Sequence, residues 1–382
     1  MNKSIYLDYA AATPLDPSVF KAMQPYYMQK FYNPSAPYLS GKAVRDEIEA
    51  ARGRIARWLG ARPAEITFTA SGTEANNLAI HGVMRQFPDA NMVVSAVEHE
   101  AVMAPAHRYN CREAVVRPSG LVDIQQLAKS IDDKTVLVSI MYANNEIGTI
   151  QPLRQVAQVV EEERARRYNQ KDGLPIYLHT DACQAGNYLN LHVHGLGVDL
   201  LTLNAGKIYG PKQTGLLYAR TGIQLVPLID GGGQENGRRS GTESPANIAG
   251  FAAALDLVQG DKQAESKRTL ELQSLFFDLL KRKIPQAVIN GTKKQRLPNN
   301  VHITIPGTDN ERIMMELDQR GVMCAVGSAC SASKEEPSHV LRAIGLSESQ
   351  AQASLRFTMG RQTKESDIKK TVDMLSKLVS HA

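Results

Sequence analysis

The chain has 382 residues, of which 43% are hydrophobic and 22% charged, a composition that suits a large globular core in two domains. Its formal net charge is only +5 and its basic runs are as short as TKKQR, so we expect solvated surface there and no direct nucleic-acid partner. The apolar run TVLVSIMYA is far shorter than the roughly 20 residues of a membrane helix, and MNKSIYLDYAAATP lacks a signal-like apolar stretch. We therefore expect a cytoplasmic protein with no membrane partner.

Helices and strands alternate along the chain from about residue 40. Apolar residues from Val44 to Trp58 recur at steps of four and three, which predicts an amphipathic helix that ends at Gly60. The β-rich runs are 65–68, 91–98, 113–118, 135–143, 175–182, 198–205 and 215–220, with helical stretches at 72–87 and 152–170. This alternation predicts a mostly parallel sheet covered by helices on both faces, which binds ligands beyond the carboxyl ends of its strands.

The pattern changes after about residue 255. A long polar helix is predicted at 261–283, followed by a strand at 299–305 and further helices. We therefore expect a second, smaller α/β domain. The four cysteines, Cys111, Cys183, Cys324 and Cys330, form no C-x-x-C pair, which argues against a disulfide framework and a zinc site, so we expect no bound metal.

The segment LNAGKIYGPKQTG puts Lys207 directly after a buried strand. A Walker A loop is excluded, because Leu201 stands where its first glycine is required and Ile208 where Ser or Thr is required. The dinucleotide pattern G-x-G-x-x-G is also absent, since GGGQENG has the wrong spacing. A lysine amine at a strand end, among small residues, remains a candidate nucleophile.

Polar residues follow other predicted strands. TASGTEANN offers Gly72 and Thr73 at the start of a helix, as an anion seat or as an ordinary helix cap. VEHEAV places His99 after another strand, where a structural histidine is the alternative. HTDACQAG ends a third strand with Asp181 and Gln184, and an acid is costly to bury there without a partner.

One cofactor uses all of these groups together. Pyridoxal 5'-phosphate needs a lysine for a Schiff base, an acid facing its pyridinium nitrogen and an anion site for its phosphate. We therefore expect a pyridoxal-phosphate site at this edge of the sheet.

Segments along nearly the whole chain match one known family. They are YLDYAAATP, FYNPSA, ITFTASGTEANNLAIHG, VEHEAV, NNEIGTIQP, HTDACQAG, GKIYGPKQTG, GRRSGTESPANIAG, GSACSASKEEPSHVLRAIGL and SLRFTMGR. The chain resembles the cysteine desulfurases, within the fold-type I pyridoxal-phosphate transferases. The segment GSAC resembles the cysteine segment of the family branch that serves iron-sulfur cluster assembly and tRNA thiolation. The resemblance implies a large cofactor-binding domain at 15–255 and a small domain at 1–14 and 256–382, with the catalytic cysteine loop at about 322–336.

The resemblance also implies roles for the cofactor site. Lys207 would carry the cofactor, Asp181 would face its ring nitrogen and Gln184 its ring hydroxyl, and His99 would stack on the ring and move protons. The phosphate would be held by Gly72 and Thr73, with Thr242 reaching across a homodimer interface.

The substrate site is implied in the same way. Arg356 and Asn145 would grip the carboxylate of L-cysteine, a task that suits a planar guanidinium, although a surface ion pair is the alternative for Arg356. Cys330 would take the substrate sulfur as a persulfide, releasing alanine. It would then pass the sulfur to an acceptor protein, for which a cluster scaffold, a tRNA-thiolation protein and a DNA-modification system are the alternatives.

Two features depart from the family or extend it. Members commonly carry Ser and His before the lysine, whereas this chain has Asn204, which can still form a hydrogen bond at the cofactor, and Gly206, which lacks an imidazole. Cys324 lies close to Cys330 in sequence and could form a disulfide with it, relay sulfur or fill space. The alternatives to a desulfurase are a selenocysteine lyase or aminotransferase on the same fold, or a non-catalytic sulfur carrier.

Overall fold

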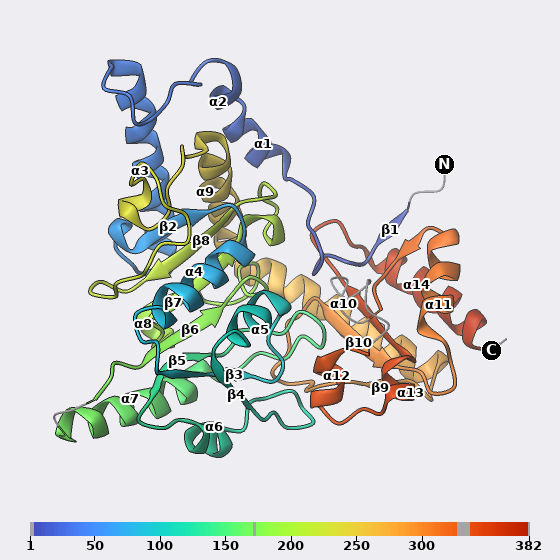
Figure 1. Ribbon diagram of the computed structural model, residues 1–382. Coiled ribbons are helices and arrows are strands. Elements are labelled where there is room, and N and C mark those ends of the chain that lie inside the picture. Colours follow the sequence, from blue (N-terminus) through green and yellow to red (C-terminus); the bar gives the residue numbers. More distant parts are fainter. Residues whose placement is uncertain (1–3, 171–172, 327–336, 381–382) are drawn as a thin grey trace.

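A computed structural model describes residues 4–170, 173–326 and 337–380. Its largest sheet has seven strands (Figure 1). In spatial order they are β2 (Ile66–Thr69), β8 (Gly215–Ala219), β7 (Leu200–Asn204), β6 (Tyr177–Asp181), β5 (Thr135–Ser139), β3 (Asn91–Ser95) and β4 (Asn110–Ala114). Of these strands only β8 runs against the others, so the predicted, mostly parallel sheet is confirmed.

Helices cover both faces of this sheet because its strands alternate the direction of their apolar side chains. In β3, Val93 faces one core while Met92 and Val94 face the other. The first core packs against α3 (Leu39–Leu59), α6 (Ile124–Ser130), α7 (Leu153–Gln170) and α9 (Pro245–Gly260), and the second against α4 (Gly72–Met84) and α5 (Glu100–Ala106). Helix α3 ends at Gly60 in a left-handed conformation, as its pattern predicts.

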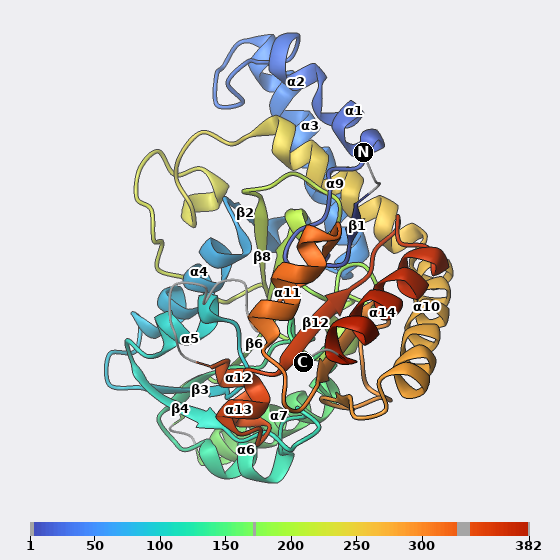
Figure 2. The same ribbon diagram turned by 90° about the vertical axis from the view of Figure 1, so that its right-hand side faces the viewer.

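A second group of elements forms from both ends of the chain (Figures 1 and 2). Strand β10 (Asn300–Thr304) pairs antiparallel with β12 (Ser354–Thr358) and β9 (Val288–Ile289), and β1 (Ile5–Tyr6) pairs with β11 (Val322–Met323). These strands pack with α10 (Lys262–Lys283), α11 (Asn310–Gln319) and α14 (Glu365–Ser380). The core includes Leu7 from the amino end as well as Phe276 and Phe357. The domain boundaries at residues 15 and 255 stay a prediction.

Short elements complete the described chain. They are α1 (Pro17–Met23), α2 (Pro25–Met28), α8 (Val193–Leu196), α12 (His339–Ala343), α13 (Glu348–Ala351), η1 (Pro63–Glu65), η2 (Ala205–Lys207) and η3 (Glu235–Gly237). Within the described ranges, no helix has the length and apolar character needed to cross a bilayer.

Several predicted boundaries are wrong, two of them because of strand pairing. The run 113–118 overlaps strand β4 only at residues 113–114, because pairing with β3 begins at Asn110 and ends at Ala114 and Val115 is exposed. The predicted cysteine loop does not start at 322, because Val322 and Met323 pair with β1 and Val322 is fully buried. Both errors arise from tertiary pairing, which overrides local composition.

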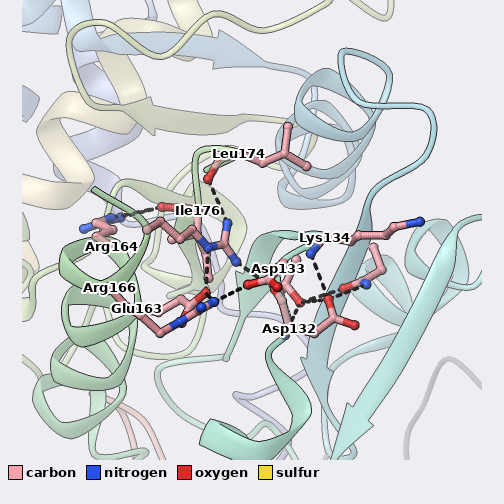
Figure 3. A network of polar contacts seen from close by, with 11 residues as sticks. Asp132, Asp133, Lys134, Glu163, Arg164, Arg166, Leu174 and Ile176 are labelled. Carbon is pink, nitrogen blue, oxygen red and sulfur yellow. Dashed lines mark hydrogen bonds and ion pairs between the residues drawn. The ribbon is translucent and has the colours of Figure 1, made fainter. Parts of the chain in front are cut away.

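Ion pairs hold the amino ends of two central strands, opposite the carboxyl ends that bear the predicted site residues (Figure 3). On α7, Glu163 accepts hydrogen bonds from Arg166 and Arg167, and Arg166 also pairs with Asp133 just before β5. Arg164 donates to the carbonyl oxygen of Ile176, just before β6. The amino ends of β5 and β6 are therefore tied to one helix.

Candidate active site

A cavity of about 280 Å³ lies at the carboxyl ends of the central strands. We call it the central cavity. The predicted residues that line it are Gly72, Thr73, His99, Asn145, Asp181, Gln184, Asn204, Lys207 and Arg356. Parallel strands end at one edge of a sheet, which explains why residues spread over nearly 300 positions meet there. Thr242 is not among its lining residues and is exposed, and Cys330 lies outside the described residues.

Lys207 enters the central cavity from η2, directly after β7. Its Nζ donates hydrogen bonds to the carbonyl oxygens of Ala10 (2.9 Å) and Ala11 (2.6 Å) on the amino-terminal segment. The small residues before it are fully packed, since Ala205 is buried and a Cβ on Gly206 would lie 3.1 Å from the Lys212 side chain. The sequence Asn-Ala-Gly therefore lets the chain turn tightly and direct the amine inward.

Asp181 is a buried carboxylate at the end of β6, with its side chain at the central cavity. Its Oδ2 accepts a hydrogen bond of 2.7 Å from Asn76 Nδ2, and its Oδ1 accepts one of 2.9 Å from the backbone N–H of Cys183. The predicted cost of burying this acid is thus offset by two donors. Such a carboxylate can stabilise a cation in the cavity.

The amino end of α4 lies where the sequence predicts an anion seat. Ser71 caps the helix by accepting the N–H of Glu74 (3.1 Å), while Gly72 and Thr73 line the central cavity. The cap is compatible with an anion seat, since the first N–H groups of a helix have no partner within it. A Cβ on Gly72 would lie 2.8 Å from Cys183 Sγ, so any larger residue here would have to displace that side chain.

His99 caps α5, and its Nδ1 accepts the N–H of Ala101 (3.0 Å). The ring also lines the central cavity, so the histidine combines the structural and the candidate functional position. The preceding Glu98 is fully buried, and burial, followed by the charge of Asp181, raises its pKa to about 8. Glu98 Oε1 accepts from Ser95 (2.7 Å) and from the N–H of Met141 (2.6 Å), which fixes the ends of β3 and β5.

Arg356 is not a surface residue: it is 2% exposed and lies on β12 with its guanidinium at the central cavity. Its Nη1 donates to the carbonyl oxygen of Asn145 (3.0 Å) and its Nη2 to Asp8 Oδ1 (2.7 Å). The two predicted carboxylate-binding residues are therefore in contact. They come from distant parts of the chain: Asn145 follows β5 of the seven-stranded sheet, and Arg356 lies on β12 of the three-stranded sheet.

The two departures before Lys207 have visible consequences. Asn204 Oδ1 accepts the N–H of Gly206 (2.8 Å), so the asparagine holds the turn as well as lining the cavity. The Lys212 side chain lies beside Gly206, where a side chain would otherwise start. Burial, followed by the charge of Lys207, lowers the pKa of Lys212.

Cys324 is buried in the same apolar cluster as Leu7 and Phe357. Burial, followed by the charge of Asp8, raises its thiol pKa to about 12, so the reactive thiolate is disfavoured. Of its three predicted roles, these observations favour packing.

Sequence reasoning missed several residues that line the central cavity, among them Asn76 and Cys183, which both donate hydrogen bonds to Asp181. Asn76 lies three and four positions after Thr73 and Gly72 on the same face of a helix, a spacing that could have identified it. Cys183 is two residues beyond Asp181, and burial, followed by the charge of Asp181, raises its thiol pKa well above the usual value. It is therefore a packing residue at the wall of the cavity.

Comparisons with known proteins agree with this geometry. Residues 5–371 match the model of the class-V aminotransferase family. The chain is 41% identical to cysteine desulfurase IscS of Dictyoglomus turgidum, over 99% of this chain and 95% of the relative. The chain belongs to the cysteine desulfurase family. Cysteine desulfurase IscS of Methanosarcina thermophila is 36% identical over 99% of this chain and 92% of the relative.

Solved structures of the cysteine desulfurase family and its relatives share the fold. A NifS-like protein superimposes with a TM-score of 0.91 at 28% identity, covering 99% of this chain and all of the other. The structure of SspA in complex with cysteine gives 0.81 at 32% identity, covering 93% and 99% of the two chains. The predicted fold-type I architecture is thereby confirmed, and the protein is an enzyme of this family.

Family membership implies pyridoxal phosphate as the cofactor. The residues of the central cavity fit this group. Asp181 is a buried carboxylate with a side chain at the cavity, Gly72 leaves open the approach to a helix amino end, and Lys207 supplies an amine. An acid, an anion seat and a lysine are the three protein groups that such a cofactor requires.

Proposed function

We propose that this protein converts L-cysteine to L-alanine and transfers the sulfur, as a persulfide on Cys330, to an acceptor. The observation that carries the proposal is the joint presence of Lys207, Asp181, His99 and Arg356 around one cavity. The full-length similarity to IscS proteins and to SspA bound to cysteine supports the choice of substrate.

In this proposal Lys207 would hold pyridoxal phosphate. When bound, the group would supply an electron sink that weakens the bonds at the α and β carbons of an amino acid substrate. Asp181 stabilises the protonated ring nitrogen, and the amino end of α4 at Gly72 and Thr73 binds the phosphate. Gln184 contacts the ring hydroxyl, and Asn204 and Thr242 add polar contacts.

The other residues act on the substrate. Arg356, with Asn145, binds the carboxylate, because a guanidinium presents two parallel donors to it. His99 moves protons between substrate and cavity, which an imidazole can do near neutral pH. Cys330 attacks the substrate sulfur: the S–S bond forms, the C–S bond breaks, and the carbon fragment gains a proton and leaves as alanine.

A homodimer is part of the proposal. Thr242 is exposed and outside the central cavity, so the contact to the phosphate that the family implies has to come from a second chain. The amino-terminal segment also exposes large apolar side chains that a second copy can cover. They are Phe20, Tyr27, Met28, Phe31, Tyr38 and Leu39. Sedimentation velocity should give a species of twice the chain mass, and a monomer at micromolar concentration would contradict the dimer.

The sulfur acceptor and the cellular location are proposed from the family alone. The IscS-named relatives support a role in iron-sulfur cluster assembly, and we propose a cluster scaffold or a tRNA-thiolation protein as the acceptor, in the cytoplasm. Pull-down with each candidate acceptor and ³⁵S transfer from labelled L-cysteine would distinguish the two.

The central test uses the purified protein loaded with pyridoxal phosphate. L-cysteine with a reductant should yield alanine and sulfide in equal amounts. Cys330→Ser should lose both products, whereas Cys111→Ser, a partly exposed cysteine on β4, should retain them. Lys207→Ala should lose the visible band of the bound cofactor. Transamination without sulfide release would favour an aminotransferase, selenocysteine as the only substrate would favour a lyase, and no turnover would favour a sulfur carrier.

A further inference from the structure

Asp8 is paired with Arg356 although the two residues are 348 positions apart. The distance from Arg356 Nη2 to Asp8 Oδ1 is 2.7 Å, and the side chains are only 3% and 18% exposed. Because the pair is largely removed from water, it holds its geometry better than a surface ion pair, whose side chains exchange partners freely.

The backbone of Asp8 is itself held in place. The carbonyl oxygen of Asp8 accepts hydrogen bonds from Tyr6 Oη (2.9 Å) and from the N–H of Ala11 (3.0 Å). Asp8 also bridges to Thr358, two residues beyond Arg356 on the same strand. The main chain of Asp8 is therefore fixed relative to β12, so its short side chain reaches Arg356 from an anchored backbone position.

The guanidinium keeps donors for a further anion. Nη1 and Nη2 each carry two hydrogens and use one bond apiece, to Asn145 and Asp8. The buried Nε–H has no hydrogen-bond partner among the residues that the structure describes. Arg356 is thus anchored at two points, with unused N–H groups beside the central cavity.

We propose that Asp8 is a positioning residue, which holds the Arg356 fork in the orientation that binds the α-carboxylate of the substrate. This inference rests on the proposed function, because it assigns Arg356 to that carboxylate. The same segment also holds Lys207 through Ala10 and Ala11, so the amino-terminal segment orients both cations of the site. Without Asp8 the guanidinium has a single anchor and loses orientation toward the ligand.

The test compares two ligands that differ only in the carboxylate. L-alanine and ethylamine are titrated into the cofactor-loaded protein, and the visible absorption band gives each Kd without sulfur chemistry. Asp8→Ala should weaken L-alanine binding about tenfold or more, the loss of one hydrogen bond to a charged group, and leave ethylamine binding unchanged. The KM for L-cysteine should rise by a similar factor while kcat changes less than about threefold.

Three further variants control for charge, position and folding. Asp8→Asn keeps an oxygen acceptor for Nη2 and should bind L-alanine within about threefold of wild type. Asp8→Glu keeps the charge but moves the carboxylate by one methylene, so it should weaken L-alanine binding. This variant replaces Asp8→Ala in the test if Asp8→Ala does not fold. Asp261→Asn removes the carboxylate from another Asp–Arg pair, with Arg361, and should change neither Kd.

The outcomes separate the inference from the proposed function. Unchanged or tighter L-alanine binding in a folded Asp8→Ala, or in Asp8→Glu, would overturn the positioning role. An equal loss for ethylamine would also overturn it, since a general disturbance does not depend on the carboxylate. If the wild-type protein shows no visible band or no response to amino acids, the proposed function fails and the inference fails with it.

Discussion

The backbone N–H of Arg361 donates a hydrogen bond of 2.8 Å to the phenolic oxygen of Tyr209, two residues beyond Lys207. Tyr209 is buried and has a left-handed backbone with φ of 64°, an unfavourable conformation for a bulky residue. The tertiary contacts therefore hold the chain around Lys207 in a strained turn, and Arg361, three residues beyond the end of β12, is part of that restraint.

Replacing Tyr209 by Phe should destabilise the protein. The change leaves the N–H of Arg361 without its acceptor, which we expect to lower the free energy of unfolding by about 1 kcal/mol or more. Urea denaturation measures this, with Tyr27→Phe as the control, because Tyr27 is 58% exposed and should be neutral. Equal stability of the Tyr209→Phe and wild-type proteins would show that water replaces the lost acceptor at no cost.

Asn76→Ala should weaken cofactor binding. The variant removes the 2.7 Å hydrogen bond to Asp181 Oδ2, so one oxygen of a buried carboxylate loses its donor and the side chain its orientation. We expect the Kd of pyridoxal phosphate, measured by fluorescence titration, to rise about tenfold. Asn77→Ala is the matched control, because the Asn77 side chain donates to the carbonyl oxygen of Thr73 on its own helix and, among the described residues, has no hydrogen bond to Asp181. A change of equal size in both variants would indicate a general effect on α4.

Glu98→Gln should alter how stability depends on pH. The pKa of Glu98 is about 8 in the folded protein against an ordinary value of 4.5, so the folded state binds its proton more tightly than the unfolded state does. The contribution of Glu98 to the free energy of unfolding is fully present below pH 4.5. It is lost as the pH rises to about 8, with a slope of at most about 1.4 kcal/mol per pH unit.

The glutamine variant lacks this titration. The wild-type protein should therefore lose free energy of unfolding relative to Glu98→Gln between pH 4.5 and 8, as measured by chemical denaturation at several pH values. Parallel curves for the two proteins would mean that Glu98 titrates alike in the folded and unfolded states.

Gly206→Ala should couple energetically to Lys212. A Cβ at 206 would lie 3.1 Å from Lys212 Cδ, so the added methyl group is crowded in wild type and relieved when Lys212 is Ala. A double-mutant cycle on the free energy of unfolding should give a coupling of about 0.5 kcal/mol or more. Gly53→Ala meets nothing within 4 Å and should not couple. Zero coupling at 206 would mean that the lysine moves aside freely.

Much of the site follows from local sequence rules. The polar residues His99, Asp181 and Lys207 each follow an apolar run, and parallel strands bring such positions to one edge. The same rules cannot find the partners of these residues. Asp8 and Arg356 lie near opposite ends of the chain, and no periodicity connects them. The end of β4 and the start of the segment after β11 were also missed, because strand pairing set both.

The sequence by itself determined the fold class and the chemical groups of the site, because period-two and helical patterns and strand-end residues are local properties of the chain. Only the tertiary structure decided that Arg356 is buried against Asp8, that Cys324 is enclosed by apolar side chains and that Thr242 lies away from the cavity. Burial and contact depend on which distant segments pack together. That choice is made by the whole core at once and is not encoded at any single position.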